Sequence, residues 1–468
     1  MSGIHEECGI FGIYDYSGGH AAAAAFFGLV ALQHRGQESC GIAVNNAREI
    51  EYYKNVGLVN DVFDTDKINA LQGDIAVGHA RYSTYGGGGV RNAQPLVLNY
   101  VKGTLAVAHN GNIINSDELK REYEKTGAIY QTTADSEIIA YTIAKQRLNT
   151  GSIEDAVAAS MKILKGAYSL IVMSPQKLIA ARDPWGFRPL CMGRTESGSV
   201  VFASESCALD AVGASFERDI MPGEVVAVKR PRITGAECPC SERPDIKVNR
   251  DNCRENSHLC IFEYIYFARP DSVIEGQFVQ EARREAGRLL AAQMPVEADI
   301  VIGVPDSGLG AARGYSLASG ILMEEGFMKN RYITRTFIRP TQQSREAAVR
   351  LKLNPIRPHV ENKRVIMVDD SIVRGTTSKR IVRLLRNAGA KEVHVRISAP
   401  PFLNPCYFGT DIPSKKDLIA YSHNIDEIRD YIEADTLCFL SIENLYKIAP
   451  NARTGFCSGC FSGEYPVE

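Results

Sequence analysis

The chain has 468 residues, which is enough for two to four domains at a usual size of roughly 150 residues each. It carries 53 basic and 55 acidic residues, and the resulting net charge of −2 argues against a general nucleic-acid binder and against binding to acidic membrane surfaces. No segment approaches the roughly 18 apolar residues of a membrane-spanning helix. From the charge and from this pattern together, we expect neither a nucleic-acid nor a membrane partner.

The N-terminal segment, MSGIHEECGIFGIY, lacks the basic, apolar and small-residue regions of a secretory signal. We therefore expect a cytoplasmic protein whose 12 cysteines stay reduced. Because 12 cysteines are many for a reducing compartment, some of them should act as a nucleophile or as metal ligands.

Residues 8–235 are predicted to form an α+β domain. Short β-like runs such as SCGIAV and SLIVM are separated by helical patterns such as DSEIIAYTIAKQRL. Residues 236–257 are polar and contain proline, which predicts a linker.

Residues 258–468 are predicted to form a second domain with a mostly parallel sheet and a cysteine-containing C-terminal segment. Strand-like and helical segments alternate at the spacing of βαβ units. The expected strands lie in ADIVIGVPDSG (298–308), KRVIMVDDSIVRG (363–375) and EVHVRISAP (392–400), and the expected helices in QEARREAGRLLAAQM (280–294), LGAARGYSLASG (309–320) and TTSKRIVRLLRNAGA (376–390).

Cys8, in EECGIFGIY, is a candidate nucleophile, although a buried structural cysteine in a first strand is the alternative. Four further motifs follow it in order, and together with Cys8 they resemble the N-terminal-nucleophile glutamine amidotransferase domain. They are QHRGQES (33–39), GHARYSTYG (78–86), AHNGNI (108–113) and TADSEI (133–138).

The resemblance implies that residues 1–7 are a propeptide whose removal leaves Cys8 with a free α-amine. An α-amine with a pKa of about 7.7–8.0 can act as the general base for the thiol of the same residue. The thiolate would attack the side-chain amide of glutamine and release ammonia. The resemblance further assigns Asn110 and the backbone N–H of Gly111 to an oxyanion hole, Arg81 to the α-carboxylate of glutamine and Asp135 to its α-ammonium group. His34, His79 and His109 are expected to be structural hydrogen-bonding residues.

The segment VIMVDDSIVRGTT (365–377) predicts a buried strand, an acidic pair and a loop that leads into a helix. In open α/β sheets ligands bind at the carboxyl ends of the strands, and a helix N-terminus can bind a phosphate. Two adjacent carboxylates suit a sugar diol or Mg²⁺, although a turn that caps the helix is the simpler interpretation. The segment resembles the 5-phosphoribosyl-1-pyrophosphate (PRPP) motif of type I phosphoribosyltransferases, which implies a binding set of Asp369, Asp370, Ser371, Arg374, Gly375, Thr376 and Thr377.

A second loop, GVPDSG (303–308), has the same strand–loop–helix pattern. In the family it corresponds to the pyrophosphate loop, which implies that Asp306 and Ser307 bind PRPP and that Ser307 joins Asp369 and Asp370 around Mg²⁺. By itself the sequence PDSG is also a common turn.

Between these loops, residues 329–352 carry seven basic side chains and one acidic side chain, Glu346. A run of charge is usually a solvated surface. Its place between two anion-binding loops suggests a lid that closes over the pyrophosphate.

Cys457 and Cys460 form a C-x-x-C pair, which is half of a zinc or iron–sulfur site or else a redox pair. The candidates for two further ligands are Cys253, Cys260, Cys406 and Cys438. These cysteines resemble the cluster ligands of the iron–sulfur type of the glutamine phosphoribosylpyrophosphate amidotransferase family. The resemblance implies a structural [4Fe–4S] cluster, with structural zinc as the alternative. The implied ligands are Cys260, Cys406, Cys457 and Cys460.

Together these motifs resemble the glutamine phosphoribosylpyrophosphate amidotransferases of the iron–sulfur type. The resemblance implies an αββα N-terminal-nucleophile domain followed by an α/β type I phosphoribosyltransferase domain. It also implies synthesis of phosphoribosylamine from glutamine and PRPP, feedback inhibition by purine nucleotides and a homotetramer. Two alternatives remain: a glutaminase with a different acceptor, such as a hexosamine phosphate, and a non-enzymatic regulator that binds PRPP.

Overall fold

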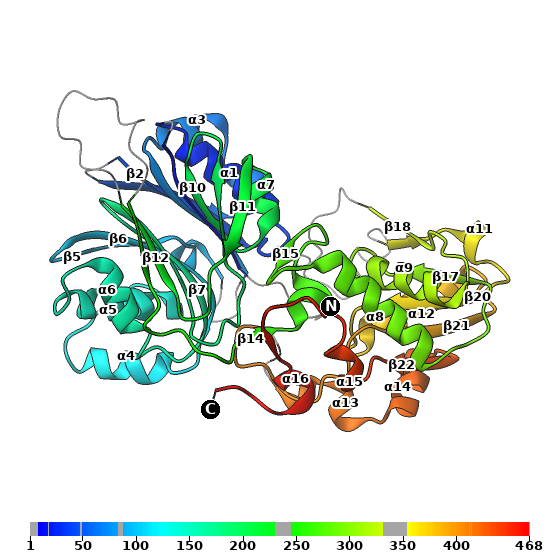
Figure 1. The fold of residues 1–468 in the computed structure, drawn as a ribbon. Helices are drawn as coiled ribbons and strands as arrows, with labels where there is room; N and C mark the ends of the chain where they lie inside the picture. The colour runs from blue at the N-terminus through cyan, green and yellow to red at the C-terminus, as the bar shows by residue number, and fades with distance from the viewer. Residues whose placement is uncertain are drawn as a thin grey trace.

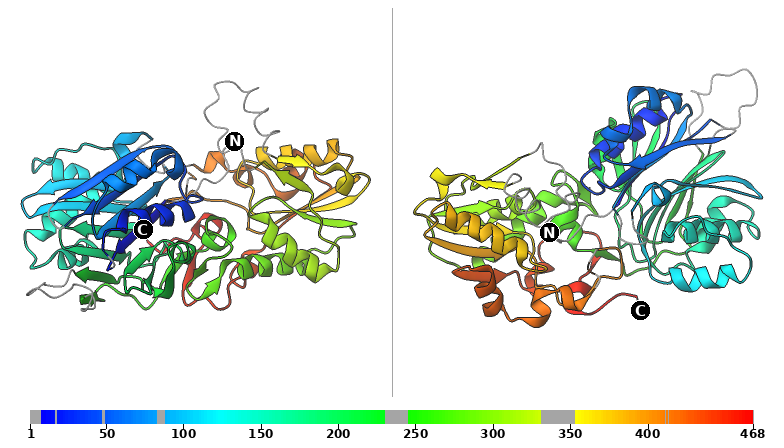
Figure 2. Two further views of the ribbon diagram at one scale, coloured as in Figure 1. Left: turned by 90° about the horizontal axis from the view of Figure 1, so that it is seen from above. Right: turned by 180° about the vertical axis from the view of Figure 1, so that it is seen from behind.

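The computed structural model describes residues 8–16, 18–46, 49–82, 88–229, 245–330, 353–410, 412 and 414–467. They form two halves that lie side by side (Figures 1 and 2). The expected propeptide (1–7) and nearly all of the expected basic lid (331–352) lie outside the described residues. No helix in the described part of the chain is both long and apolar enough to cross a membrane.

The first half contains two antiparallel sheets. The seven-stranded sheet has the order β11-β9-β10-β1-β4-β2-β3, and the six-stranded sheet has the order β13-β12-β8-β7-β6-β5. The strands are β1 (Gly9–Tyr14), β2 (Ser39–Asn45), β3 (Ile50–Val56), β4 (Ile75–Arg81), β5 (Leu96–Tyr100), β6 (Gly103–Ile113), β7 (Gly166–Ser174), β8 (Lys177–Arg182), β9 (Cys191–Thr195), β10 (Val200–Ala203), β11 (Ala214–Asp219), β12 (Val225–Lys229) and β13 (Asp245–Asn249).

Strand β1 shows why the central strands of these sheets are apolar on both faces. Phe11 and Ile13 belong to the core beneath helix α1, whereas Ile10 and Tyr14 belong to the core between the two sheets. Successive side chains of a strand point to opposite faces, so a strand that is covered on both sides shows no polar alternation.

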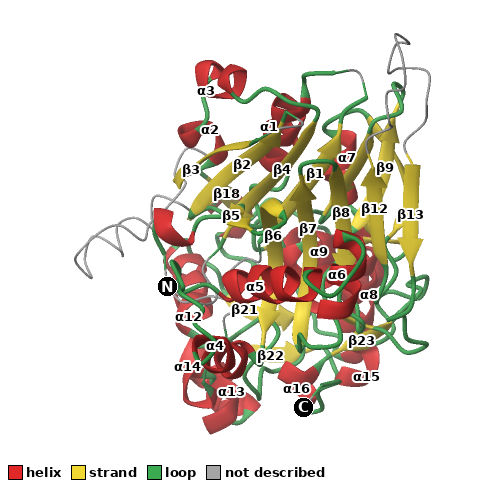
Figure 3. Cartoon of the chain, turned by 90° about the vertical axis from the view of Figure 1, so that its left-hand side faces the viewer, coloured by secondary structure: helices red, strands yellow, loops and turns green. Residues whose placement is uncertain are grey.

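A third core lies between the six-stranded sheet and helices α4, α5 and α6, which cover its outer face (Figure 3). The layers therefore run helix, sheet, sheet, helix, and the expected αββα domain is confirmed. The helices of this half are α1 (Ala21–Ala31), α2 (Val59–Val62), α3 (Thr65–Ala70), η1 (Val90–Asn92), α4 (Ser116–Glu124), α5 (Asp135–Arg147), α6 (Ile153–Ser160) and α7 (Ser206–Asp210).

The predicted linker needs one correction. Within residues 236–257, Asp245–Asn249 forms the edge strand β13, which pairs antiparallel with β12. Its sequence, DIKVN, alternates polar and apolar residues, and Ile246 packs against the core between the sheets. This alternation is typical of a strand with one exposed face, so the first domain continues past residue 235.

The second half is built on the four-stranded parallel sheet β17-β20-β21-β22, as expected. Its strands are β14 (His258–Cys260), β15 (Val273–Ile274), β16 (Gln277–Phe278), β17 (Ile300–Gly303), β18 (Phe327–Lys329), β19 (Leu353–Pro355), β20 (Arg364–Asp369), β21 (Glu392–Ile397), β22 (Thr436–Phe439) and β23 (Gly455–Cys457). Its helices are the π-helix η3 (Glu263–Phe267), α8 (Val279–Gln293), α9 (Gly308–Ser319), α11 (Arg357–Val360), α12 (Thr376–Asn387), η4 (Lys415–Asp417), α13 (Ile419–Ser422), α14 (Ile425–Ile432), α15 (Ile442–Leu445) and α16 (Gly459–Ser462).

The C-terminal segment runs back toward the first half. Strand β23 pairs parallel with β14, so Cys457 lies opposite Cys260. Figure 1 shows this red segment, with α16, in the lower centre of the molecule, where the two halves meet. The predicted cysteine cluster therefore lies close to the boundary between the domains.

Candidate active sites

Cys8 is the first described residue and directly precedes β1. The residue is 8% exposed, and its Sγ lies 3.4 Å from the backbone oxygen of Tyr82. Its own backbone oxygen accepts a hydrogen bond of 3.1 Å from Nε of Arg35. The predicted nucleophile is therefore held at a defined point at the start of the seven-stranded sheet.

Pairing across the sheets brings the neighbouring candidates to the same end of the domain. Gly9 of β1 is paired with Ala80 of β4, next to Arg81. His79 of β4 donates from Nε2 to the backbone oxygen of His109 on β6, at 2.9 Å. Arg81 and the residue after His109, which is Asn110, therefore lie near the start of β1.

Asn110 has the features of an oxyanion-hole donor. Its side chain is buried, and neither Oδ1 nor Nδ2 has a hydrogen-bond partner among the described residues. Burial of an amide without a partner costs about 1–3 kcal/mol, and a catalytic role is one explanation for such a group in a native protein. The backbone of Gly111 has a φ of 135°, and a Cβ there would lie only 2.1 Å from the oxygen of Ala167, so only glycine fits.

Arg81 and Asp135, the predicted glutamine-binding pair, are both buried. The Oδ2 atom of Asp135 accepts from the backbone N–H of Ile113 at 3.0 Å, and its Oδ1 lies 3.7 Å from Nδ1 of His109. Burial alone would raise the pKa of Asp135, but His109, the Ile113 N–H and Arg81 together lower it. Asp135 is therefore an ionised carboxylate that can bind a cation.

The histidines in the motifs make structural contacts. Burial lowers the pKa of His79 to about 3, so this ring is neutral and positions β6 through its bond to His109. His34 Nε2 lies 2.7 Å from Glu205. The contact between His109 and Asp135 was not predicted from the sequence, because only the fold brings β6 to the first turn of α5.

The second candidate site lies at the carboxyl ends of β17 and β20. These strands are parallel neighbours, with Gly303 opposite Val368. Ser307 Oγ donates to Oδ1 of Asp370 at 2.6 Å, which joins the two predicted loops directly. The other carboxylate oxygen of Asp370 accepts from Ser371 Oγ at 2.5 Å. Serines from both loops therefore donate to the same carboxylate, that of Asp370.

Asp369 shares this site but faces a different environment. It is buried at the end of β20, and its Oδ1 accepts from the backbone N–H of Asp370 at 3.0 Å. Burial and the adjacent charge of Asp370 raise the pKa of Asp369 well above its usual range. Two close carboxylates of this kind suit a cation or sugar hydroxyls between them.

The loop after the acidic pair leads into α12, which begins at Thr376. Gly375 has a φ of 74° and lies so close to Ile419 that a Cβ would be 2.8 Å from its Cδ1. The first turn of α12, with Thr376 and Thr377, presents backbone N–H groups and hydroxyls suited to a phosphate. Arg374, in the same loop, forms an ion pair with Asp417 at 3.4 Å.

The loop predicted to bind pyrophosphate (303–308) extends toward the basic segment. Asp306 is exposed and contacts Nζ of Lys329, the first basic residue of that segment. A side chain paired with a lysine is a weaker candidate for a direct PRPP ligand than Ser307. The remaining basic residues of the predicted lid lie outside the described residues.

The four implied cluster ligands come together from three segments. Cys260 and Cys457 are partners across β14 and β23, and the backbone oxygen of Cys460 accepts from the N–H groups of Leu403 and Asn404, close to Cys406. All four are free thiols. The other two candidates lie elsewhere, since Cys438 is in β22 beside Gln293, and Cys253 lies near Glu224.

Burial dominates the electrostatics of these thiols. Burial, with the charges of the neighbouring thiols, raises the pKa values of Cys260 and Cys460 well above the usual range and that of Cys457 to about 12. The backbone N–H of Phe408 donates to Sγ of Cys406 at 3.4 Å, a type of bond that also tunes cluster sulfurs. In the described part of the chain, no three His, Cys, Asp or Glu side chains are placed to hold one metal ion. The four thiols therefore stay a predicted ligand set, for a [4Fe–4S] cluster or for structural zinc.

Comparisons with known families match each half separately. A model of the glutamine amidotransferase domain matches residues 79–211, and a model of the phosphoribosyl transferase domain matches residues 274–401.

Full-length relatives match the chain as a whole. The amidophosphoribosyltransferase of Methanocaldococcus jannaschii is 48% identical over 463 residues, which cover 98% of each chain. That of Bacillus subtilis is 46% identical over 473 residues and covers 100% of this chain and 96% of the relative. The chloroplastic amidophosphoribosyltransferase 2 of Arabidopsis thaliana is 46% identical over 465 residues, which cover 99% of this chain and 80% of the relative.

Two solved structures have the same fold over almost the whole chain. The structure described as the allosteric regulatory enzyme of purine biosynthesis superposes with a TM-score of 0.90, at 46% identity, over 98% of this chain and 96% of its own. The glutamine PRPP amidotransferase from B. subtilis, complexed with ADP and GMP, superposes with a TM-score of 0.88, at 45% identity, over 98% of both chains.

Proposed function

The chain belongs to the amidophosphoribosyltransferase family, and on that premise we propose which of its residues carry out each part of the reaction. The enzyme hydrolyses glutamine and transfers the ammonia to PRPP, which gives 5-phosphoribosylamine, glutamate and pyrophosphate. This is the first step of de novo purine biosynthesis. The full-length relatives and the matched phosphoribosyl transferase domain favour this reaction over a hexosamine-phosphate acceptor and over a regulator without activity.

In the first half, Cys8 is the nucleophile. Once residues 1–7 are removed, its α-amine accepts the thiol proton and the thiolate attacks the amide carbon of glutamine. The Nδ2 of Asn110 and the N–H of Gly111 donate to the oxyanion that forms, and ammonia leaves after it gains a proton. Water then hydrolyses the thioester to glutamate.

Glutamine is held by two charged residues in this half. Arg81 binds its α-carboxylate and Asp135 binds its α-ammonium group. The observation that carries the assignment of this site is the buried Asn110 amide, which has no hydrogen-bond partner among the described residues.

In the second half, ammonia attacks the anomeric carbon of PRPP and pyrophosphate leaves. Asp369 and Asp370 bind the ribose hydroxyls, and the start of α12 binds the phosphate. The hydrogen bond between Ser307 and Asp370 supports a single site made from both loops. The phosphate-binding residues of the α12 loop are Ser371, Arg374, Gly375, Thr376 and Thr377.

The acidic pair and Ser307 also fit Mg²⁺, which prefers oxygen ligands and one or two carboxylates beside substrate phosphates. Bound there, Mg²⁺ would supply positive charge for the departing pyrophosphate. Asp306, whose side chain contacts Lys329, is a further proposed PRPP-binding residue of this loop.

The four thiols of Cys260, Cys406, Cys457 and Cys460 fit a [4Fe–4S] cluster with a structural role. Such a cluster would tie β14, β23 and residues 403–406 together where the domains meet. The reaction itself moves no electrons, which supports a structural role.

Feedback inhibition by purine nucleotides is supported by the structure of the B. subtilis glutamine PRPP amidotransferase, which was solved in complex with ADP and GMP. The homotetramer and the cytoplasmic location remain predictions. The relatives include archaeal and bacterial proteins as well as chloroplastic ones.

The test of this assignment is a comparison of two nitrogen donors. Cys8→Ala should lose phosphoribosylamine synthesis from glutamine and retain synthesis from ammonia with PRPP and Mg²⁺. Loss of both activities in a folded Cys8→Ala protein, or retention of both, would contradict the division of roles.

A further inference from the structure

Arg35 is a buried residue of the QHRGQES motif to which the assigned reaction gives no role. It follows α1, and its side chain is fully buried. Its Nε donates to the backbone oxygen of Cys8 at 3.1 Å. The guanidinium group therefore contacts the main chain of the proposed nucleophile.

The rest of the Arg35 guanidinium is bound by two carboxylates. Nη1 and Nη2 each donate at 2.9 Å to one oxygen of Glu263, and Nη1 also donates to Glu205 at 2.7 Å. A two-point bond to a carboxylate fixes the plane of a guanidinium group. Since Nε lies in that plane, the Glu263 carboxylate sets the direction of the bond to Cys8.

Glu263 comes from the other half of the molecule. It is the first residue of η3, 228 residues after Arg35, and its side chain is fully buried. The helix is anchored by Arg283 of α8, which donates to the backbone oxygens of Tyr264, Tyr266 and Ala268. The carboxylate therefore projects from a fixed element of the phosphoribosyltransferase half.

Glu205 cannot replace this support. Its two oxygens also accept from His34, from the backbone N–H of Arg269 and from Ser272 Oγ. It meets Arg35 only at Nη1, and a single contact leaves the guanidinium plane free to turn.

We propose that Glu263 is a positioning residue for the glutaminase, because it orients Arg35 and thereby fixes the backbone of Cys8. The inference rests on the proposed role of Cys8. A chain that begins at Cys8 has one covalent neighbour only, so hydrogen bonds to its carbonyl have a large share in fixing its position. The phosphoribosyltransferase half thus contributes to the geometry of the other active site.

The experiment compares Glu263→Gln with the matched control Glu275→Gln. Glu275 is also a buried carboxylate of the second half that binds an arginine of the first, since Arg182 Nη1 donates to it at 2.5 Å. Arg182 also donates to the backbone oxygens of Arg188, Ile220 and Gly186, and none of these bonds is to Cys8. Both variants weaken the domain interface, but only Glu263→Gln removes the two-point bond that fixes the guanidinium plane of Arg35.

In Glu263→Gln, the glutamine-dependent kcat should fall by about tenfold to a hundredfold, because a displacement of about 1 Å in a reacting group can cost about a hundredfold. The KM for glutamine should stay unchanged, since Arg81 and Asp135 are untouched. Ammonia-dependent synthesis should persist, and alkylation of Cys8 by iodoacetamide, read by mass spectrometry, should change in rate. Glu275→Gln should keep the ratio of glutamine-dependent to ammonia-dependent rates.

Equal loss of the two rates in Glu263→Gln, or an unchanged ratio as in Glu275→Gln, would overturn the proposal. If Glu263→Gln does not fold, Glu263→Asp, which withdraws the carboxylate by one methylene, is measured with the same two outcomes. The double variant Arg35→Lys with Glu263→Gln should be no worse than the poorer single variant. Cys8→Ala is assayed alongside. If Cys8→Ala retains glutamine-dependent synthesis, the assignment of the nucleophile is wrong. If Cys8→Ala loses this synthesis but Glu263→Gln keeps the normal ratio of glutamine-dependent to ammonia-dependent rates, only the positioning role is rejected.

Discussion

Ser307 donates a hydrogen bond of 2.6 Å to Asp370, although 63 residues separate them in the chain. The contact crosses from the loop after β17 to the loop after β20. Because these strands are parallel neighbours, their carboxyl ends meet, and one site can bind the phosphate, ribose and pyrophosphate parts of one substrate.

Asp370→Asn should lower phosphoribosylamine synthesis from glutamine and from ammonia alike. Loss of one charged group from a site that stabilises developing charge typically costs about a hundredfold or more in kcat. The measurement is pyrophosphate release with each nitrogen donor in turn.

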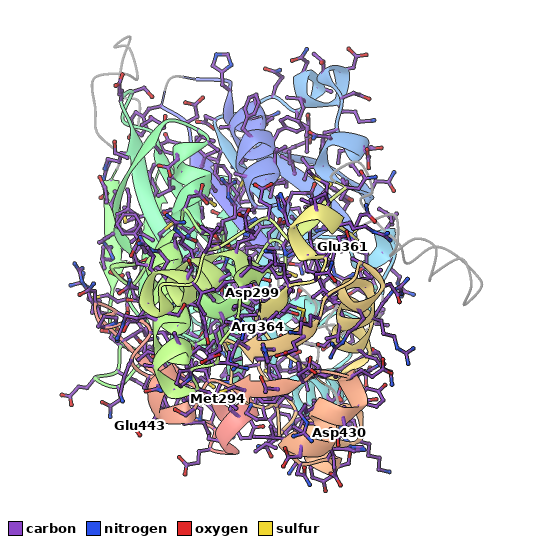
Figure 4. The ribbon with its side chains drawn as sticks, turned by 90° about the vertical axis from the view of Figure 1, so that its right-hand side faces the viewer. Met294, Asp299, Glu361, Arg364, Asp430 and Glu443 are labelled. Carbon is purple, nitrogen blue, oxygen red and sulfur yellow. The ribbon has the colours of Figure 1, made fainter. Side chains whose placement is uncertain are left out.

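The control for Asp370→Asn is Asp299→Asn. Asp299 lies at the opposite end of the same strand pair, beside Arg364, with which it forms a 3.0 Å ion pair (Figure 4). The Asp299→Asn variant should leave the rates with glutamine and with ammonia unchanged. An Asp370→Asn enzyme that is slow with glutamine and normal with ammonia would place Asp370 outside the PRPP site.

Asn110→Ala should abolish much of the glutaminase activity without loss of stability. Removal of an oxyanion-hole donor lowers kcat by about a hundredfold to a thousandfold. The free energy of unfolding should stay equal or rise, because the buried amide has no hydrogen-bond partner among the described residues. Glutaminase kinetics and thermal unfolding of the same preparation check both parts.

Asn92→Ala provides the contrast for stability. Asn92 is also buried, but its Nδ2 donates to Thr133 Oγ1 at 2.9 Å and its Oδ1 accepts from the Thr133 N–H at 3.1 Å. Loss of these bonds should cost about 1–3 kcal/mol of stability. If Asn110→Ala is destabilised to the same extent, the Asn110 side chain has a structural partner and not a catalytic one.

Asp219→Asn should change how stability depends on pH. Burial and the nearby charge of Glu275 raise the pKa of Asp219 from 3.8 to about 7. Between these values the folded protein retains a proton that the unfolded chain releases, so the stability from this group is full below pH 4 and is lost as the pH rises through about 7.

The asparagine variant has no such proton to lose. Relative to the unmodified protein, its free energy of unfolding should therefore rise between pH 4 and pH 8, as measured by urea denaturation at each pH. A difference between the two proteins that is the same at both ends of this range would show that Asp219 titrates normally.

Cys457→Ser should remove the cluster. Anaerobically purified protein should contain about four iron atoms per chain, and the variant almost none, with a loss of visible absorbance and a lower unfolding temperature. Cys253→Ser, a free cysteine outside the group of four, should retain the iron. One zinc ion per chain and no iron in the unmodified protein would reject the cluster.

The sequence predicts the local parts of both sites well. The segment around Asp369 and Asp370 is a short apolar run, an acidic pair and a glycine loop, and each part depends on neighbours in the chain. The α+β class of the first domain and the parallel sheet of the second were predictable for the same reason, whereas the αββα layering was implied only by the family resemblance. The edge strand at Asp245–Asn249 was missed because its alternation covers only five residues in a polar segment.

Relationships between distant residues could not be predicted in this way. Nothing in the sequence near Arg35 indicates that its guanidinium binds Glu263, because the pair forms only when the two domains pack together. The missing partner of the Asn110 amide is likewise a property of the folded surroundings, not of the motif AHNGNI.

The most direct test of the whole account measures glutamate and pyrophosphate in one reaction with glutamine, PRPP and Mg²⁺. Equal amounts of the two products are expected, together with loss of glutamate formation in Cys8→Ala while ammonia still supports pyrophosphate release. Formation of glutamate by Cys8→Ala, or glutamine-dependent release of pyrophosphate from PRPP with no matching glutamate, would contradict the claim that the thiol of Cys8 releases from glutamine the ammonia that is used at Asp369 and Asp370.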